Sequence, residues 1–273
     1  MKIVEQFSMS KTGQPCDNED AIVVTDHFAA IIDGMTPKEK ALYDGQSSAR
    51  IAVDLLAREI NSFSADIPYP DAVSKLTRCL YRYYKQRGIL EEVSLHPANR
   101  MAASLILYSS CRKELWLVGD CQCLIDGVHV TNEKLVDHLL SDWRSKLVEQ
   151  YLLKYSVDEL LANDRSREDL SRFLVTQYEF QNNRYDSLLS YAVLDGFPVR
   201  ESDIRVIAVS DAKVIVMASD GYPVLQEDRQ ESERLLHELL AEDPLCYRSY
   251  RSTKGLTKGN ASFDDRSYLK LLI

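Results

Sequence analysis

The chain has 273 residues, a net charge of −9 and an apolar content that is ordinary for a globular protein. This length is sufficient for one large domain or two small ones, with ample residues for a core. The acidic charge and the absence of a Lys/Arg run exclude a typical nucleic-acid surface. No apolar stretch approaches the roughly 18 residues of a membrane-spanning helix, so no membrane partner is expected.

The N-terminus and the cysteines indicate the compartment. The first six residues, Met1-Lys2-Ile3-Val4-Glu5-Gln6, contain no apolar segment of the kind that a secretory signal has. The six cysteines form no CxxC pair and no spacing typical of zinc, so we interpret them as reduced thiols. These features predict a cytoplasmic protein.

The first part of the chain opens with strands and continues with helices. Residues 1–10 and 20–32 are expected to form a hairpin or an adjacent pair of strands, separated by a turn at 11–15. Apolar residues then recur at helical spacing over 47–63 and over 70–88. The sequence therefore predicts two amphipathic helices after the first strands.

Further strands and two helical regions follow. The charged region 132–183 is predicted to be helical, and 232–240 is predicted to be a short helix that Pro244 ends. Strands are predicted over seven stretches: 102–108, 114–118, 121–125, 188–194, 204–209, 214–218 and 267–273.

This order of elements indicates an α+β fold. Strands and helices do not alternate as they do in a parallel doubly wound sheet. Most strand connections look like hairpins, which favours antiparallel sheets covered by helices. No internal repeat, low-complexity tract or Gly/Pro-rich linker divides the chain. We therefore expect a single domain at 1–273 with a helical insertion at about 132–187.

Acidic residues gather at the ends of the predicted strands. The four clusters are Asn18-Glu19-Asp20, Asp33-Gly34, Ser219-Asp220-Gly221 and Asp264-Asp265. An unpaired carboxylate is costly to bury, so these residues are poor choices for packing. Hard cations such as Mg²⁺ or Mn²⁺ require oxygen ligands gathered from several segments. The pattern therefore predicts a divalent-metal site.

Each feature taken singly has a simpler interpretation. Asp-Gly alone is usually a turn, and the Gly-Asp pair that ends at Asp120 is also an ordinary hairpin element. Lys11 is interpreted as a solvated side chain, and Asp265 as a residue that caps or orients its neighbour. The five histidines form no spaced pair and are interpreted as surface residues. Ser109, Ser110 and Cys111 show no base partner, which leaves a nucleophilic mechanism without support.

Five motifs stand in a fixed order beside the predicted strands. They are Asn18-Glu19-Asp20, Asp33-Gly34, Val118-Gly119-Asp120-Cys121-Gln122, Met217-Ala218-Ser219-Asp220-Gly221 and Phe263-Asp264-Asp265-Arg266-Ser267-Tyr268. In this order they resemble the motifs of the metal-dependent serine/threonine protein phosphatases of the 2C type. The third is similar to the family's VGDSR turn and the fourth to its LASDG segment.

The resemblance implies a fold and an activity. The fold is a four-layer α/β-β/α sandwich, in which two antiparallel sheets pack face to face with helices on the outer faces. The activity is removal of phosphate from phosphoserine or phosphothreonine in proteins, by attack of a hydroxide that bridges two Mg²⁺ or Mn²⁺ ions. The implied partner is a phosphorylated protein, with a Ser/Thr kinase as the opposing enzyme.

The resemblance also implies a role for each acidic residue. Asp33 would bridge the two ions and, with Asp220, would be essential for catalysis. The Gly34 carbonyl would complete the coordination of one ion, since glycine lets backbone and metal approach closely. The remaining implied ligands are Asp264 on the second ion, Glu19 and Asp20 directly or through waters, and Asp120 with Asp220 at a third ion.

The chain departs from the family at the substrate-binding positions. Pro15 stands where catalytic members carry an arginine that clamps the phosphate. Met35 replaces a histidine or glycine after Asp-Gly, and Asp265 replaces an asparagine. Lys11, Lys38 and Lys40 are candidate replacements for the arginine.

Two alternatives to a protein phosphatase therefore remain open. One is a catalytically weak or inactive metal-binding regulatory or scaffold domain, and the other is a small-molecule phosphatase. The insertion at 132–187 would lie near the site and determine the partner if it corresponds to the family's variable flap.

Overall fold

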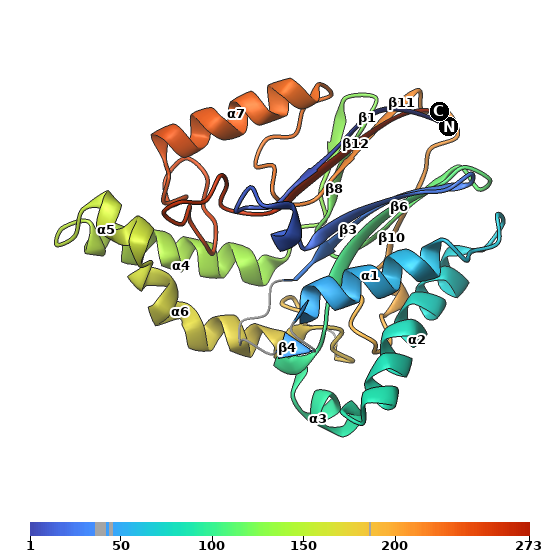
Figure 1. Cartoon of the computed structure of the whole chain (residues 1–273), viewed down its shortest axis with the longest axis horizontal. Coiled ribbons are helices and arrows are strands. Elements are labelled where there is room, and N and C mark those ends of the chain that lie inside the picture. Colours follow the sequence, from blue (N-terminus) through green and yellow to red (C-terminus); the bar gives the residue numbers. More distant parts are fainter. Residues whose placement is uncertain (36–41, 44–45, 186) are drawn as a thin grey trace.

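Two five-stranded antiparallel sheets pack face to face in the computed structural model, which describes residues 1–35, 42–43, 46–185 and 187–273 (Figure 1). The first sheet has the order β1 (Lys2–Met9), β12 (Arg266–Leu272), β11 (Val214–Ala218), β8 (Gln122–Ile125) and β9 (Val128–Val130). The second has the order β10 (Arg205–Ala208), β7 (Glu114–Val118), β6 (Ala103–Ser109), β3 (Phe28–Gly34) and β2 (Asp20–Val24). The predicted α+β sandwich is confirmed.

The central strand β3 shows why the sandwich forms. Successive side chains of a strand point to opposite faces of its sheet. Ala29 and Ile31 accordingly face the core between the two sheets, whereas Ala30 and Ile32 pack in the core beneath the outer helices. Because both of its faces are buried, β3 is a continuous apolar run up to Asp33.

Helices cover the outer faces of the sandwich. The second sheet is covered by α1 (Ser48–Ile60) and α2 (Tyr69–Arg87), whose apolar faces share a core with β3 and β6. The hydroxyl of Ser47 accepts the backbone N–H of Arg50 and so begins α1. On the other side, α7 (Arg229–Glu242) lies over the first sheet, to which an ion pair from Glu233 to Arg266 connects it (Figure 1).

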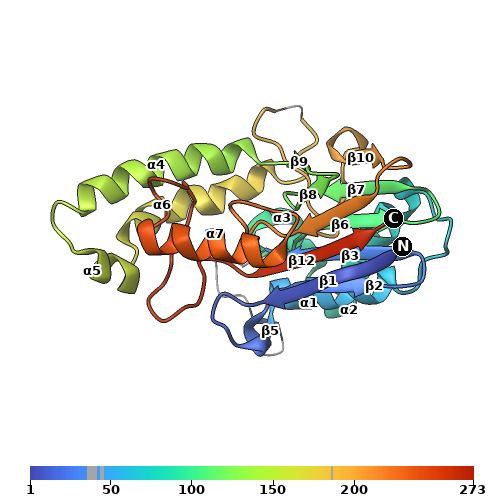
Figure 2. The same cartoon turned by 90° about the horizontal axis from the view of Figure 1, so that it is seen from above.

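Three helices extend from one end of the sandwich (Figures 1 and 2). They are α4 (Leu135–Tyr151), α5 (Val157–Ala162) and α6 (Arg165–Thr176). α4 and α6 pack on one another through a small core that includes Leu140 and Leu170. The remaining regular elements are α3 (Leu90–Leu95) and the two-residue strands β4 (Leu42–Tyr43) and β5 (Gln46–Ser47).

Two predictions about strands are wrong. Residues 1–10 do not pair with 20–32, because β1 pairs along its length with β12, while 20–32 contains two strands, β2 and β3, that pair with each other. The segment 188–194 is not a strand but turns and isolated bridges. There the side chain of Asn182 bonds both the N–H and the C=O of Val193, so these groups are not available to a neighbouring strand.

Among the described residues, no helix combines the length and the apolar character that crossing a membrane requires.

Candidate functional site

Five of the seven predicted metal ligands line one pocket, which has a volume of about 490 Å³. They are Asp33, Gly34, Asp120, Asp220 and Asp264. The pocket lies where strand ends of both sheets meet the helices α4 to α6, since its wall also contains residues of that helical region. Glu19 and Asp20 do not line the pocket. Asp20 is nevertheless the cross-strand partner of Asp33, which does line it, and Glu19 precedes Asp20 in the chain.

Asp33 and Asp220 join the two sheets at this point. Asp33 is the next-to-last residue of β3 and Asp220 follows β11, and the backbone N–H of Asp220 donates to Oδ2 of Asp33 over 3.4 Å. Burial raises the pKa of Asp33 well above its usual value, and the charges of Asp220 and Asp20 raise it further. Burial, Asp264 and Asp120 likewise raise the pKa of Asp220. A nearby cation would therefore stabilise both carboxylates.

Asp20 has two buried oxygens without a hydrogen bond. Neither Oδ atom has a partner of normal geometry, although the hydroxyls of Ser219 and Ser267 are close enough to lower its pKa. Burial outweighs them and raises that pKa to about 7. A buried carboxylate in this state needs a proton or a cation.

Gly34 is required by packing. A Cβ at this position would lie 2.5 Å from the carbonyl oxygen of Glu19 and 3.1 Å from the Cβ of Ala49 on α1. The Gly34 N–H donates to that same carbonyl. Close packing of β3 on β2 and α1 therefore explains this glycine without a metal.

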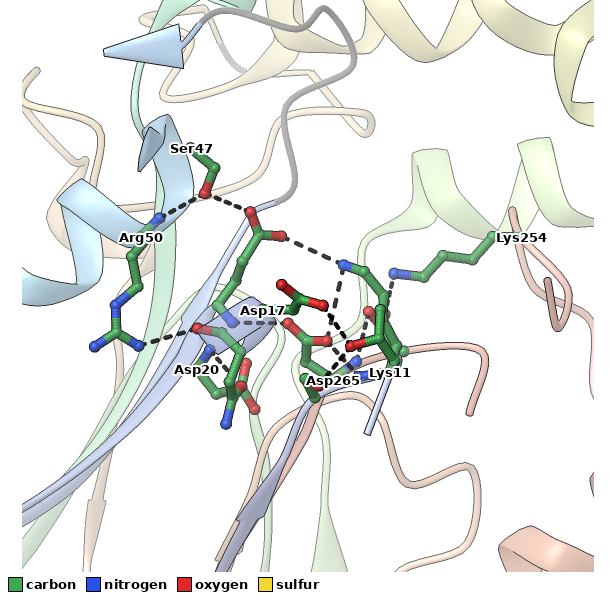
Figure 3. A network of polar contacts seen from close by, with 12 residues as sticks. Lys11, Asp17, Asp20, Ser47, Arg50, Lys254 and Asp265 are labelled. Atoms are coloured by element: carbon green, nitrogen blue, oxygen red, sulfur yellow. Dashed lines mark hydrogen bonds and ion pairs between the residues drawn. The ribbon is translucent and has the colours of Figure 1, made fainter. Parts of the chain in front are cut away.

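Glu19 and Asp265 both bond to the first loop, and Figure 3 shows Asp265 beside Lys11. The oxygens of Glu19 accept the hydroxyl of Ser47 over 2.6 Å and the ammonium of Lys11 over 3.4 Å. Those of Asp265 accept the backbone N–H groups of Lys11 and Glu19 over 2.7 and 2.8 Å. The orienting role predicted for Asp265 is consistent with these bonds. The interpretation of Lys11 as a solvated side chain is wrong, because its ammonium pairs with Glu19 and Asp265.

Two lysines that the sequence did not point to contact the predicted ligands. Lys134 Nζ lies 2.7 Å from Oδ2 of Asp120, and Lys254 forms an ion pair with Asp264. Burial alone would raise the pKa of both aspartates, but the paired lysines outweigh it and lower the pKa. Both lysines lie in segments outside the five motifs, and no spacing in the sequence marks them.

The donor set fits a hard divalent cation in part. Within the described residues, no three Asp, Glu, His or Cys side chains are grouped closely enough to enclose a metal as they stand. Asp20 is buried and Asp33 and Asp220 are half-buried, and a cation would relieve the repulsion that Asp220 and Asp20 exert on Asp33. Asp120 and Asp264, in contrast, already hold an ammonium each.

The positions predicted to bind substrate differ in their relation to the pocket. Pro15 is exposed and does not belong to the pocket wall, whereas Met35 does. Lys38 and Lys40 lie outside the described residues. Cys111 is exposed, and its Sγ lies 3.6 Å from Nδ1 of His27, next to the start of β3 and so at the opposite end of that strand from Asp33.

Solved structures of bacterial serine/threonine phosphatases have the same fold. PstP/Ppp of Mycobacterium tuberculosis aligns at a TM-score of 0.50 and 15% identity, over 98% of this chain and 97% of that one. Stp1 from Staphylococcus aureus aligns at 0.51 and 12%, over 100% and 96%. The catalytic domain of PstP in complex with two manganese ions aligns at 0.50 and 16%, over 98% and 97%.

At these identities the likeness establishes the fold, which is the one that the resemblance implied. No model of a protein family and no curated protein sequence matches the chain.

Proposed function

We propose that this chain, which has the fold of the serine/threonine phosphatases named above, is a metal-dependent hydrolase of phosphoserine and phosphothreonine in proteins. The observation that carries the proposal is the meeting of Asp33 and Asp220, from different sheets, in one pocket. Packing alone does not account for these two half-buried carboxylates, because burial and the charge of Asp220 oppose ionisation of Asp33, while burial and the charges of Asp264 and Asp120 oppose ionisation of Asp220. A site for divalent cations does account for them.

The carboxylates of Asp33 and Asp220 would hold the ions. Asp20, Glu19, the Gly34 carbonyl and Asp264 complete the proposed set of ligands, and Mg²⁺ or Mn²⁺ suits its oxygen donors. When bound, such ions lower the pKa of a coordinated water toward about 7 and supply a nucleophile for phosphorus. PstP, of the same fold, has been solved with two manganese ions.

The chain's own residues keep these carboxylates in place. Asp265 holds the backbone of Lys11 and Glu19 against the start of β12, and Ser47 orients the side chain of Glu19. The hydroxyl of Ser104 donates to Asp120 over 2.5 Å. The acidic side chains thus approach the pocket from fixed strand ends, as a preformed site requires.

One observation favours a second function, a metal-binding regulatory or scaffold domain with little or no turnover. Asp120 and Asp264 are neutralised by lysines, and Pro15 offers no cation to the substrate. A hydrolase of small phosphorylated metabolites is the third alternative, and the same assay separates all three.

The testing experiment is hydrolysis of p-nitrophenyl phosphate and of a phosphothreonine peptide with Mn²⁺, Mg²⁺ or chelator. We expect turnover only with metal and faster turnover of the peptide at equal concentration. Asp33→Asn and Asp220→Asn should abolish it, whereas Asp211→Asn, at an exposed turn, should retain it. Mn²⁺ binding without turnover of either substrate would establish the scaffold alternative. Turnover confined to the small ester would favour the metabolite alternative.

The proposed partner is a phosphorylated protein, opposed by a Ser/Thr kinase. All six cysteines are free thiols, which supports a reducing compartment, and we place the protein in the cytoplasm. We retain the interpretation of 1–273 as a single domain in which 132–187 is an insertion, since α4 to α6 lie in that range and contribute to the pocket wall.

A further inference from the structure

Lys254 brings an ammonium group to the acidic pocket from the loop between α7 and β12. It lines the same pocket as Asp33 and Asp220, and its side chain is 27% exposed. Its ammonium pairs with Asp264 and approaches the acidic residues of the site from the same side as Lys11 (Figure 3). Lys254 therefore presents a cation that a ligand in the pocket can contact.

Three further cations of the pocket wall, Lys134, Lys11 and Arg251, each have a partner of their own. Lys134 is only 7% exposed, and its ammonium lies between Asp120 and an aromatic ring. The ammonium of Lys11 is held in the first loop by Glu19. Arg251 forms an exposed ion pair with an acidic residue of α4. Lys254 differs from these three cations because it combines a 27% exposed side chain with a partner, Asp264, that itself lines the pocket.

A fully buried arginine fixes the loop that carries Lys254. Arg144 of α4 is 0% exposed, and its Nη1 donates to the carbonyls of Leu245, Cys246 and Ser252 over 2.9, 3.2 and 3.0 Å. Its Nε and Nη2 donate to Asp164, at the start of α6, over 3.0 and 2.6 Å. One side chain thus connects two helices to both arms of the loop.

The residues on either side of Lys254 are fixed as well. Arg167 of α6 donates to the carbonyl of Thr253. A Cβ at Gly255 would lie 2.7 Å from the carbonyl oxygen of Leu245, so the backbone there can only approach as a glycine. The helical region therefore fixes the backbone around Lys254, and its partly exposed side chain pairs with Asp264.

From these contacts we infer that Lys254 binds the phosphate group of the substrate, and that Arg144 and Arg167 position it for this role. The inference rests on the proposed function. The first loop has Pro15 where a phosphate-binding cation would be expected, and the α7–β12 loop would supply that cation through Lys254. Lysine binds phosphate as a point charge on a flexible stem, so its ammonium can leave Asp264 for a phosphate oxygen by rotating its own side chain.

Calorimetry with inorganic phosphate tests the ligand directly and needs no turnover. Mn²⁺-loaded wild type should bind phosphate, and Lys254→Met should weaken this binding by about tenfold or more, as loss of a charge-assisted hydrogen bond does. Lys254→Arg should recover much of the affinity. Lys258→Met, an exposed lysine of the same loop, is the matched control and should bind as wild type does.

Several results would overturn the inference. One is wild type that binds Mn²⁺ but no phosphate. Another is a Lys254→Met variant whose phosphate affinity is unchanged. A third is a Lys254→Met variant that loses Mn²⁺ affinity and phosphate affinity in parallel, which would mean that Lys254 only holds Asp264. Failure of the proposed function is seen separately, as the absence of metal-dependent turnover in wild type. Phosphate binding that depends on Lys254 without turnover would preserve the phosphate site and reject hydrolysis.

The positioning role has its own measurement. Arg167→Met should raise KM for the phosphopeptide severalfold while kcat changes less than twofold, and Arg167→Lys should recover part of the affinity. Melting curves establish that both variants fold. Two results for folded Arg167→Met would contradict positioning through Lys254. One is an equal decrease in kcat and in kcat/KM, and the other is an unchanged KM.

Discussion

The backbone N–H of Asp220 donates to Oδ2 of Asp33 over 3.4 Å, although Asp33 belongs to a strand of one sheet and Asp220 follows a strand of the other. β3 and β11 thus end at the same place, and their carboxylates are neighbours across the sandwich. The arrangement is unfavourable without a cation, because burial and the charge of Asp220 raise the pKa of Asp33, while burial and the charges of Asp264 and Asp120 raise the pKa of Asp220. The consequences below can be measured without an assay of activity.

Asp33→Asn should stabilise the metal-free protein while it weakens metal binding. The amide removes one of the repelling charges, so the melting temperature in chelator should rise. Wild type should in turn be stabilised by Mn²⁺, by about 2.7 kcal/mol at 100 times its dissociation constant. Differential scanning calorimetry with and without Mn²⁺ measures both effects. A wild-type curve that is identical in chelator and in Mn²⁺ would reduce these acids to turn residues.

Metal-free protein should lose stability as the pH rises from about 4 to about 7. Burial raises the pKa of Asp20 from 3.8 to about 7, so in this interval the folded chain keeps a proton that the unfolded chain has released. Raising the pH therefore favours unfolding, and the effect is complete above pH 7. Melting temperatures in chelator at pH 5 and pH 8 measure it. Asp20→Asn cannot ionise and should show a smaller decrease; an equal decrease would contradict the assignment.

Lys134→Met should add a metal site. The ammonium of Lys134 lies 2.7 Å from Asp120, where the resemblance implies a third ion. Wild type should therefore bind two Mn²⁺ ions, and the variant three. Equilibrium dialysis followed by metal analysis gives the stoichiometry, with Lys146→Met, an exposed lysine of α4, as the control. The same stoichiometry in all three proteins would show that Lys134 does not exclude a cation.

Arg100→Met should destabilise the fold by about 3–5 kcal/mol, the usual cost of breaking a buried ion pair. Arg100 Nη1 lies 3.0 Å from Oδ2 of the fully buried Asp195, and its guanidinium stacks 3.8 Å from the ring centroid of Phe197. Denaturant unfolding measures the loss. Adding Asp195→Asn should recover part of it, since the uncompensated charge is then gone.

Arg78→Met, on the exposed face of α2, is the control and should change the free energy of unfolding by less than about 0.5 kcal/mol. A loss no larger in Arg100→Met than in this control would mean that the Arg100–Asp195 pair does not stabilise the core.

The sequence alone predicted most of the elements and the position of the acidic residues at strand ends. Strong periodicity placed the helices 47–63 and 70–88 to within three residues at each end, since a helix that buries one face must repeat its apolar residues. The acidic residues at strand ends were also recognised, because packing does not explain a carboxylate at the end of a buried strand. The metal roles of these residues, the single domain and the insertion at 132–187 stay predictions.

Only the tertiary structure decided which segments meet. β1 pairs with β12 across the whole chain, and local patterns carry no information about such distant partners. Lys134 and Lys254 could not be found from the sequence for another reason. Lys254 lies in the same α7–β12 loop as Asp264, and Lys134 directly precedes α4, but irregular segments follow no periodic pattern that pairs a lysine with an aspartate. Local rules place the carboxylates at strand ends, whereas the folded conformation of these segments decides which cations oppose them.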